Sequence, residues 1–205
     1  MRNSMVKRYA IVMLIGVALN LGLYQIAHIF HLPAWIDNIG TAYAALILEP
    51  SAGLLVAFAT NFYQAAFVYN SSSIVYYAVS ASAALSIGIL MRKQGKVAWT
   101  RLFLSLLCYL AVSSLLSTIL TLWRTAGVPD SAWEHHFYDL ALTAGLPNWL
   151  SCLFGIAVLK FSDSVVMGVL LPILFHLTPK LLKNEQIEQI VSWKNPYFHK
   201  REELP

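Results

Sequence analysis

Residues 31–41 read His31-Leu32-Pro33-Ala34-Trp35-Ile36-Asp37-Asn38-Ile39-Gly40-Thr41, and an apolar segment then continues through Leu46-Ile47-Leu48-Glu49-Pro50-Ser51-Ala52-Gly53 to Asn61. The first part places a tryptophan and an aspartate at a membrane boundary, and the second places a Glu-Pro step where hydrocarbon is expected. An acidic side chain at that depth is costly, so it usually has a partner or a function. We therefore expect the rest of the chain to be arranged around this segment.

The composition is that of an integral membrane protein. Hydrophobic residues make up 58% of the 205-residue chain and charged residues 12%, whereas soluble domains are about a quarter charged. Between Tyr9 and Met91 only Asp37 and Glu49 carry formal charge, so these apolar runs do not suit a water-soluble core. The net charge of +4 lies mostly at span ends and in the tail, which favours anionic lipid over nucleic acid as a partner.

The apolar runs predict six transmembrane helices, which form one all-α bundle over residues 1–182. A basic start precedes a run over residues 9–30 that is longer than the apolar region of a signal peptide and long enough to cross a bilayer. A second helix, over 39–67, is expected to kink or break at Pro50, because proline removes a backbone hydrogen bond. The other spans are predicted at 74–91, 99–123, 146–159 and 164–182. Lys160 and Asp163 are spaced to pair if the helix continues between the last two.

Six spans and a basic amino terminus place both termini in the cytoplasm, and we expect the bilayer to be a bacterial inner membrane. One loop disagrees with this topology, because Arg92, Lys93, Lys96 and Arg101 would lie on the outer side. A re-entrant second segment, broken at Pro50, would put these residues inside but would move the tail outside. We expect six spans.

Two short patterns resemble the vitamin-uptake superfamily. They are Pro33-x-x-Ile36-Asp37-x-Ile39-Gly40-Thr41, followed by Leu48-x-Pro50-x-x-Gly53 and Asn61, and, before the last helix, Phe161-Ser162-Asp163. This group contains the S components of energy-coupling-factor (ECF) transporters, which bind the substrate, and the related membrane input domains of some bacterial sensor proteins. The resemblance implies an S-component-like six-helix bundle that binds a vitamin-like small molecule near the outer face.

The resemblance also implies partners. S components dock on a shared transmembrane coupling subunit and a pair of ATPases through small residues of the first helix, to which Ala18 and Gly22 are the nearest match here. Ala18-x-x-x-Gly22 is a small-x-x-x-small step, which equally suits ordinary packing inside the bundle. The chain departs from the family twice: Leu48-Glu49-Pro50 stands where Leu-Gly-Pro is common, and the first helix lacks an Ala-x-x-x-Ala.

Polar and aromatic residues near the predicted span ends are the candidates for ligand binding. Asp37 is either a ligand-binding group or a cap for the helix that follows it. Asn61 and Gln64 make the far end of the second span polar, and such side chains bond to other helices or to a ligand. Several tryptophans suit an interfacial aromatic belt, but Trp35 adjoins Asp37 and Trp149 adjoins Asn148, so these two can hold a flat heterocycle. The predicted ligand-binding set is therefore Trp35, Asp37, Asn61, Gln64, Asn148 and Trp149.

Three other charged residues are assigned a structural or ligand-binding role: Glu49, Lys160 and Asp163. Glu49 can face a ligand cavity, pair with Lys160 or Arg124, or stay protonated, because burial raises the pKa of a carboxyl group. We favour structural pairing of Glu49 over a ligand-binding role.

The sequence points to neither an enzyme nor a metal centre. His135 and His136 are adjacent, whereas metal-binding pairs on a helix lie three or four residues apart. His28 and His31 have that spacing, but Asp37 is the only carboxylate near them. No glycine-rich phosphate loop, nucleophile elbow or His-Glu-x-x-His motif is present. We expect a non-enzymatic protein with no cofactor, no metal and no nucleic-acid partner.

The tail separates the remaining hypotheses. Residues 183–205 place Ile187, Ile190 and Val191 at helical spacing, which suits a short amphipathic helix on the membrane or on a partner. The tail is too short for a kinase or cyclase domain. This favours the specificity subunit of a transporter over a sensory subunit that signals through a separate protein, with a membrane scaffold as a third hypothesis.

Overall fold

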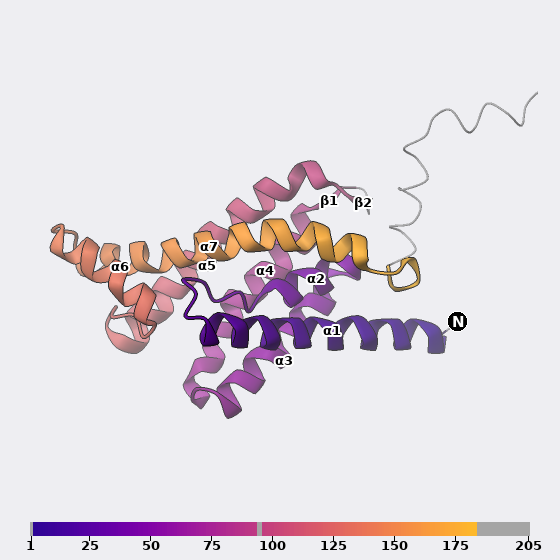
Figure 1. Ribbon diagram of the computed structural model, residues 1–205, viewed down its shortest axis with the longest axis horizontal. Helices are drawn as coiled ribbons and strands as arrows, with labels where there is room; N and C mark the ends of the chain where they lie inside the picture. Colours follow the sequence, from indigo (N-terminus) through magenta and orange to yellow (C-terminus); the bar gives the residue numbers. More distant parts are fainter. Residues whose placement is uncertain (1, 94–95, 184–205) are drawn as a thin grey trace, which may run out of the picture.

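The computed structural model describes residues 2–93 and 96–183, which form a bundle of helices that run along one long axis (Figure 1). A single pair of two-residue strands interrupts the helices of this part of the chain. In chain order the elements are α1 (Arg2–Ile29), α2 (Ile39–Ile47), α3 (Pro50–Phe67), η1 (Ser71–Tyr76), α4 (Tyr77–Leu90), β1 (Arg92–Lys93), β2 (Lys96–Val97), η2 (Trp99–Arg101), α5 (Leu102–Thr125), α6 (Ala132–Thr143), α7 (Asn148–Leu177) and η3 (Lys180–Leu182).

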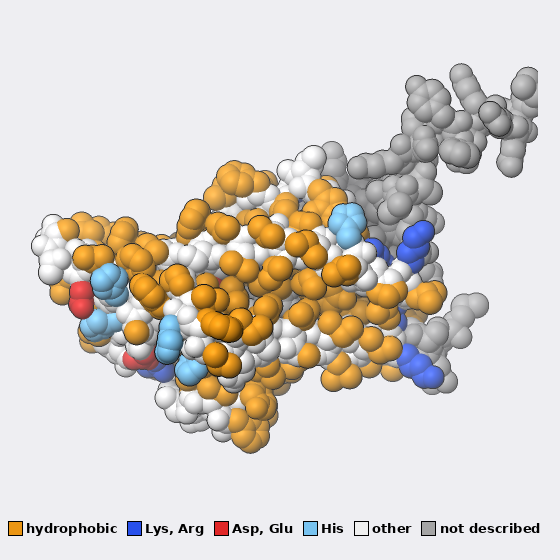
Figure 2. Space-filling view, viewed as in Figure 1, with side chains coloured by type: hydrophobic (Ala, Val, Ile, Leu, Met, Phe, Trp, Pro, Cys, Tyr) orange, Lys and Arg blue, Asp and Glu red, His pale blue; other side chains and the backbone are white. Residues whose placement is uncertain are grey.

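Four stretches of the described chain are long and apolar enough to cross a membrane: Met5–Ile29, Ser71–Leu90, Trp99–Thr125 and Asn148–Leu177. Large apolar side chains on these helices point outward, among them Leu14, Phe103, Trp123 and Leu177, and hydrophobic atoms cover most of the face seen in Figure 2. A water-soluble protein rarely exposes so much apolar surface. The protein is therefore an α-helical membrane protein, as predicted.

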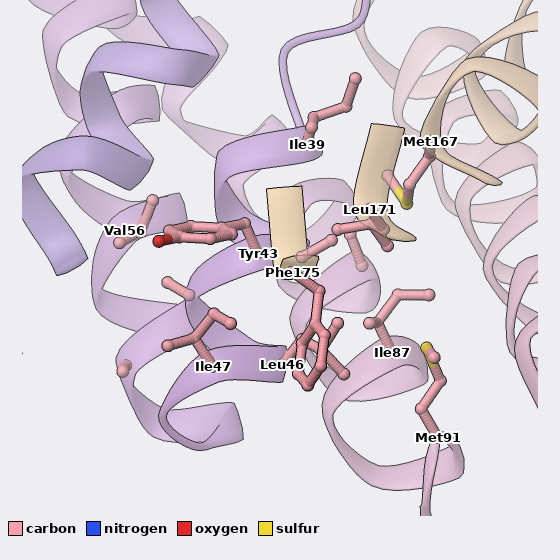
Figure 3. Close-up of a cluster of buried hydrophobic side chains, with 14 of the residues drawn as sticks. Ile39, Tyr43, Leu46, Ile47, Val56, Ile87, Met91, Met167, Leu171 and Phe175 are labelled. Atoms are coloured by element: carbon pink, nitrogen blue, oxygen red, sulfur yellow. The ribbon is translucent and has the colours of Figure 1, made fainter. Parts of the chain in front are cut away.

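The short helix α2 lies at the centre of the bundle. All nine of its residues are buried, and it packs against α1, α3, α4 and α7. Figure 3 shows Tyr43, Leu46 and Ile47 of α2 among side chains of α3, α4 and α7. The approach of α1 to α2 depends on glycine, because a Cβ at Gly40 would overlap the Gly16 carbonyl. A helix that is apolar on every side belongs in a core, which explains why the rest of the chain surrounds this one.

The predicted second span is two helices rather than one kinked helix. The chain leaves α2 at Leu48, passes through an extended Glu49, and starts α3 at Pro50, where proline is tolerated because the first turn needs no N–H donor. The two helices run antiparallel. The start of α3 packs on the end of α2, where a Cβ at Gly53 would lie 2.6 Å from the Ala45 Cβ, and Asn20 bonds Thr41 at the start of α2 and Thr60 farther along α3. The break predicted at Pro50 is thus present, and it reverses the chain.

The predicted fifth and sixth spans form one continuous helix, α7, so their separation was wrong. The two spans were divided at charged residues, yet Lys160 Nζ lies 3.4 Å from Asp163 Oδ2 inside the helix. Because these charges neutralise each other, the helix has no need to end there. The segment between the predicted spans 99–123 and 146–159 contains α6, which packs against α7.

The ends of the bundle differ in charge. Both ends of the described chain and the β1–β2 pair lie at one end (Figure 1), where Arg8 Nη1 donates to the Lys183 carbonyl over 3.3 Å. We call this the basic end, and it carries Arg8, Arg92, Arg101, Lys180 and Lys183. The opposite end, with the loop at 30–38 and α6, shows acidic and histidine side chains in Figure 2. We call it the acidic end, and it carries Asp37, Asp130, Glu134 and Asp139.

This arrangement removes the conflict over Arg92. The prediction had the chain cross the bundle once over 39–67 and twice over 146–182. In the structure the chain reverses between α2 and α3, which adds a crossing in the first region, and α7 is one continuous helix, which removes a crossing in the second. Arg92 and Arg101 therefore lie at the same end as both ends of the described chain (Figure 1). From the sequence, a re-entrant segment broken at Pro50 was expected to put the tail on the opposite side from Arg92. In the structure, such a segment and the end of the described chain at Lys183 are compatible with the same side.

Candidate ligand-binding site

A polar cavity of about 280 Å³ lies at the acidic end. Pockets that hold small molecules typically have about 300–1,000 Å³, so this one suits a small ligand. Its walls come from the loop at 30–38, the carboxyl-terminal parts of α3 and α5, the start of α4, α6 and the middle of α7. The residues used below are Trp35, Asp37, Asn38, Asn61, Gln64, Tyr69, Tyr76, Arg124, Asp130, Glu134 and Lys160.

Asp163 fixes the loop that covers one side of the cavity. Its Oδ1 accepts the backbone N–H of Trp35 at 2.7 Å and of Ile36 at 3.1 Å. Ile36 has a φ of 43°, and a β-branched residue rarely adopts this left-handed conformation. Such strain costs about 1–3 kcal/mol and persists only where the surroundings impose it. Here two hydrogen bonds to a buried carboxylate hold the backbone in place.

Lys160 and Asp163 bring opposite charges into the interior. Their residues are 5% and 3% exposed, and the ammonium group of Lys160 lies at the cavity wall. The predicted pair is thus present, and it connects the cavity to the loop through Asp163. A buried pair of this kind is costly to break, because removal of one partner leaves an uncompensated charge.

Helix α6 holds the same loop from the other side. Trp35 Nε1 donates to Glu134 Oε1 over 2.8 Å, and Trp133 Nε1 donates to the His31 carbonyl over 2.9 Å. The approach of α6 to α7 depends on Gly155, since a Cβ there would meet the Glu134 carbonyl. The loop is therefore tied to two helices, which fixes the Trp35 ring at the cavity.

Two carboxyl groups at the cavity, Asp37 and Glu134, form no ion pair with a described residue. Burial raises the pKa of Asp37, an effect that Lys160 opposes. Burial also raises the pKa of Glu134, and the hydrogen bond from Trp35 opposes this shift. Both groups are outside the four long apolar helices, on the loop and on α6. A raised pKa in a pocket is typical of groups that act on a ligand or a proton.

The side-chain amides of Asn61 and Gln64 in α3 differ in their hydrogen bonding. Asn61 Nδ2 donates to the Ala57 carbonyl at 2.8 Å and to Ser80 Oγ at 2.9 Å, so it joins α3 to α4. Gln64 is 5% exposed, and its Nε2, near Asp37, makes no hydrogen bond of ordinary geometry to a described residue. A buried donor without a partner costs about 1–3 kcal/mol, which a ligand with an acceptor atom would recover.

Four of the six predicted ligand-binding residues line the cavity, namely Trp35, Asp37, Asn61 and Gln64. Their contact with a ligand stays a prediction. The other two lie outside it. Asn148 accepts from the Tyr138 hydroxyl at 3.0 Å and donates to the Ala126 carbonyl at 2.8 Å, and Trp149 is 55% exposed. Both begin α7, where Trp149 has the exposure expected of an interfacial aromatic residue.

Glu49 lies at the basic end, far from the cavity. It pairs with neither Lys160 nor Arg124, which pair with Asp163 and Asp130. Its Oε1 accepts from Ser51 Oγ at 2.7 Å, and the positive charge that acts on it is that of Arg92. The two pairings suggested by the sequence were wrong because the chain reverses at this residue, which brings it to the end of the bundle.

Asp37 does not cap α2. The capping position is Asn38, which makes no side-chain cap bond. The cap comes instead from Asn20 of α1, whose Oδ1 accepts the N–H groups of Gly40 at 2.6 Å and Thr41 at 3.3 Å. Nδ2 of the same residue donates to Thr41 Oγ1 and Thr60 Oγ1, each at 3.0 Å. Asn20 thus joins α1, α2 and α3, a role that no local motif predicts.

Glu134 is a cavity residue that the sequence analysis did not identify. A signal was available. Glu134, Tyr138 and Ala141 are the buried residues of α6, and their spacing of four and three marks one helical face. An acidic residue on such a face needs a partner, which here is the Trp35 indole.

Ala18 and Gly22 lie on the outside of α1. Both are exposed, and a Cβ at Gly22 would meet no atom within 4 Å. Close packing inside the bundle uses Gly16 instead. The residues of the predicted tail helix, Ile187, Ile190 and Val191, lie outside the described residues.

The fold and the cavity together define an α-helical membrane protein with a polar cavity at one end. Comparison of the chain with models of known families, with curated proteins and with solved structures finds no match.

Proposed function

We propose that this protein binds a vitamin-sized small molecule in the cavity at the acidic end, as the specificity subunit of an ECF-type uptake transporter. One observation carries the proposal: a cavity of about 280 Å³ whose wall includes two carboxyl groups, Asp37 and Glu134, that form no ion pair with a described residue, and the Gln64 amide near Asp37. Buried polar groups are normally paired, so these groups are available to a ligand. The resemblance of residues 33–61 and 161–163 to the vitamin-uptake superfamily supports the same function.

Native mass spectrometry of the detergent-purified protein tests ligand binding. We expect a co-purified small molecule, or one acquired from a panel of vitamins, that is lost in Asp37→Ala and in Trp35→Ala. Trp149→Ala is the matched control, because this tryptophan lies outside the cavity, and it should keep the ligand. A protein that carries no molecule and binds none of the panel would favour the scaffold hypothesis.

Coupling to a transporter is supported by the exposed face of α1. Ala18 and Gly22 form a shallow step there, and the apolar side chains that flank it are Ile11, Leu14, Ile15, Ile26 and Ile29. Small residues at such a place let another helix approach closely. We expect a coupling subunit and ATPases to co-purify from native membranes, and we expect Ala18→Leu with Gly22→Leu to abolish this.

The control for this experiment is Ala66→Leu, at an exposed alanine of α3. If both double and control variants keep the transporter subunits, α1 is not the docking face. If a kinase or cyclase co-purifies in their place, the protein is a sensory subunit. The proposed orientation, in a bacterial plasma membrane, puts the basic end in the cytoplasm.

A further inference from the structure

The charges around the cavity do not balance. Three carboxyl groups, Asp37, Glu134 and Asp163, lie within electrostatic range of one ammonium group, that of Lys160. Asp163 uses the charge of Lys160 and accepts two loop N–H groups as well. The second cation at the wall, Arg124, pairs with Asp130. Among the described residues around the cavity, Asp163 and Asp130 are therefore paired with basic side chains. The other two carboxyl groups, those of Asp37 and Glu134, have no basic side chain paired with them.

The two unpaired groups, Asp37 and Glu134, accept hydrogen bonds from neutral side chains. Glu134 Oε1 accepts from the Trp35 indole at 2.8 Å, and Asp37 Oδ1 accepts from Asn38 Nδ2 at 2.7 Å. The Gln64 amide also acts on Asp37 as a neutral donor. These partners are neutral, so they orient the carboxyl groups without compensating a negative charge.

Other features of the cavity suit a flat, positively charged ligand with an acceptor atom. Trp35 and Tyr69 bring aromatic rings to the wall, and a cation is attracted to the face of such rings. The ring of a third aromatic residue, Tyr76, already has the Arg124 guanidinium 5.4 Å from its centroid. Gln64 Nε2 offers a buried donor at the same wall. An anion would instead meet only Lys160 and Arg124, each already paired with a carboxylate.

We infer that the ligand of this cavity is an organic cation, an amine or a positively charged heterocycle, held between Asp37 and Glu134 beside the Trp35 ring. This inference rests on the proposed function, since it names the class of ligand for the same site. Burial raises the pKa of both carboxyl groups, and a cation bound beside them favours their charged form. We therefore expect binding of a cation to promote the release of any proton that they carry.

Calorimetry with three probes of one ring system separates the charge classes: 1-methylnicotinamide as the cation, nicotinamide as the neutral molecule and nicotinate as the anion. The charge of any co-purified molecule is determined in parallel. We expect the cation to bind at least 10-fold more tightly than the other two and to release protons in buffers of different ionisation enthalpy. Glu134→Gln and Asp37→Asn should each weaken cation binding at least 10-fold. Asp139→Asn, an acidic residue of α6 that pairs with His135 outside the cavity, is the matched control.

The outcomes separate the inference from the proposed function. A cation among the co-purified molecules or the bound probes, lost in Glu134→Gln but kept in Asp139→Asn, supports both. A neutral or anionic molecule that still binds to Glu134→Gln overturns the inference and leaves the proposed function standing. If no molecule of any charge co-purifies or binds, the proposed function fails, and the inference fails with it.

Discussion

Both ends of the bundle bury charged side chains, but they satisfy them differently. At the basic end, Arg92 Nη2 donates to the carbonyl oxygens of Ala45, Leu46 and Leu48. These residues lie at the carboxyl-terminal end of α2. The last carbonyl groups of a helix lack an N–H partner within it, so the guanidinium supplies a donor at the end of α2. At the acidic end, Asp37 and Glu134 receive hydrogen bonds only from neutral side chains.

This difference separates a structural charge from a functional one. A buried charge with its complement inside the protein contributes to the fold, and nothing remains for a ligand to supply. A buried acid without that complement lowers stability until a proton or a ligand neutralises it. The comparison therefore predicts that variants at the basic end change stability alone, whereas variants at the acidic end change binding and pH dependence.

The largest effect is expected for Asp163→Ala, because Asp163 serves both the fold and the site. The change leaves the Lys160 ammonium buried without a partner and frees the N–H groups of Trp35 and Ile36. Breaking a buried pair costs about 3–5 kcal/mol. We expect a loss of this size in the free energy of unfolding, measured in detergent, together with loss of ligand binding.

A second substitution separates the two causes. Lys160→Met in the Asp163→Ala background removes the uncompensated charge, so it should recover part of the stability. Binding should stay absent, because the loop at 30–38 is still released. If the double variant were no more stable than Asp163→Ala, the ion pair would not be the source of the loss.

The next effect is expected at the basic end, for Arg92→Met. Methionine keeps much of the length of the side chain but removes the donor that the carbonyl oxygens of Ala45 and Leu46 share. We expect a loss of about 2–3 kcal/mol in the free energy of unfolding and unchanged ligand affinity in calorimetry. Arg101→Met is the control, since Arg101 donates no side-chain hydrogen bond to a described residue. If Arg92→Met bound the ligand more weakly, substitutions at the basic end would not affect stability alone, and the predicted difference between the two ends would be wrong.

The sequence predicts the membrane class and the importance of residues 31–61, because hydropathy and a Glu-Pro step are local signals. It does not predict that Pro50 reverses the chain. Proline removes a hydrogen bond whether the helix bends or ends, and the choice depends on Gly53 packing against Ala45 and on Asn20 bonding Thr41 and Thr60. Such contacts join residues far apart in sequence.

The cavity shows the same limit. Trp35, Asp37, Asn61 and Gln64 were predicted from polarity next to apolar runs, and all four line it. Asn148 and Trp149 have the same local pattern but begin a helix on the outside of the cavity. Helix rotation decides between these cases, and it is fixed by tertiary contacts such as that of Gly155 with α6.

A smaller effect, specific to the acidic end, is expected in the pH dependence of stability. Because burial raises the pKa of Asp37 and Glu134 from their ordinary values of 3.8 and 4.5, the folded protein binds more protons than the unfolded chain just above those values. The free energy of unfolding therefore falls as pH rises through the raised pKa values. Burial is the largest cause of both shifts, Lys160 opposes them, and Asp163 adds to them.

Glu134→Gln should remove part of this dependence. We expect the ligand-free variant to be more stable than the unchanged protein at neutral pH and equally stable near pH 4. Thermal unfolding in detergent across that range measures the difference. A melting temperature that rises with pH in the unchanged protein would mean that the carboxyl groups have their charges compensated within the fold.

The smallest effect is expected for Glu49→Gln. This variant allows the two ends of the bundle to be compared at the same residue type, glutamate. Glu49 and Glu134 are both glutamates next to a helix start, but Glu49 accepts from Ser51 and lies in the field of Arg92 at the basic end. Glutamine keeps the acceptor oxygen and removes only this long-range attraction. We expect a change within about 0.5 kcal/mol, as for most surface substitutions, no change in the pH profile, and no change in cation affinity. If Glu49→Gln altered the pH profile as much as Glu134→Gln, the carboxyl groups of the acidic end would not differ in charge compensation from Glu49. The electrostatic argument for a cationic ligand would then fail.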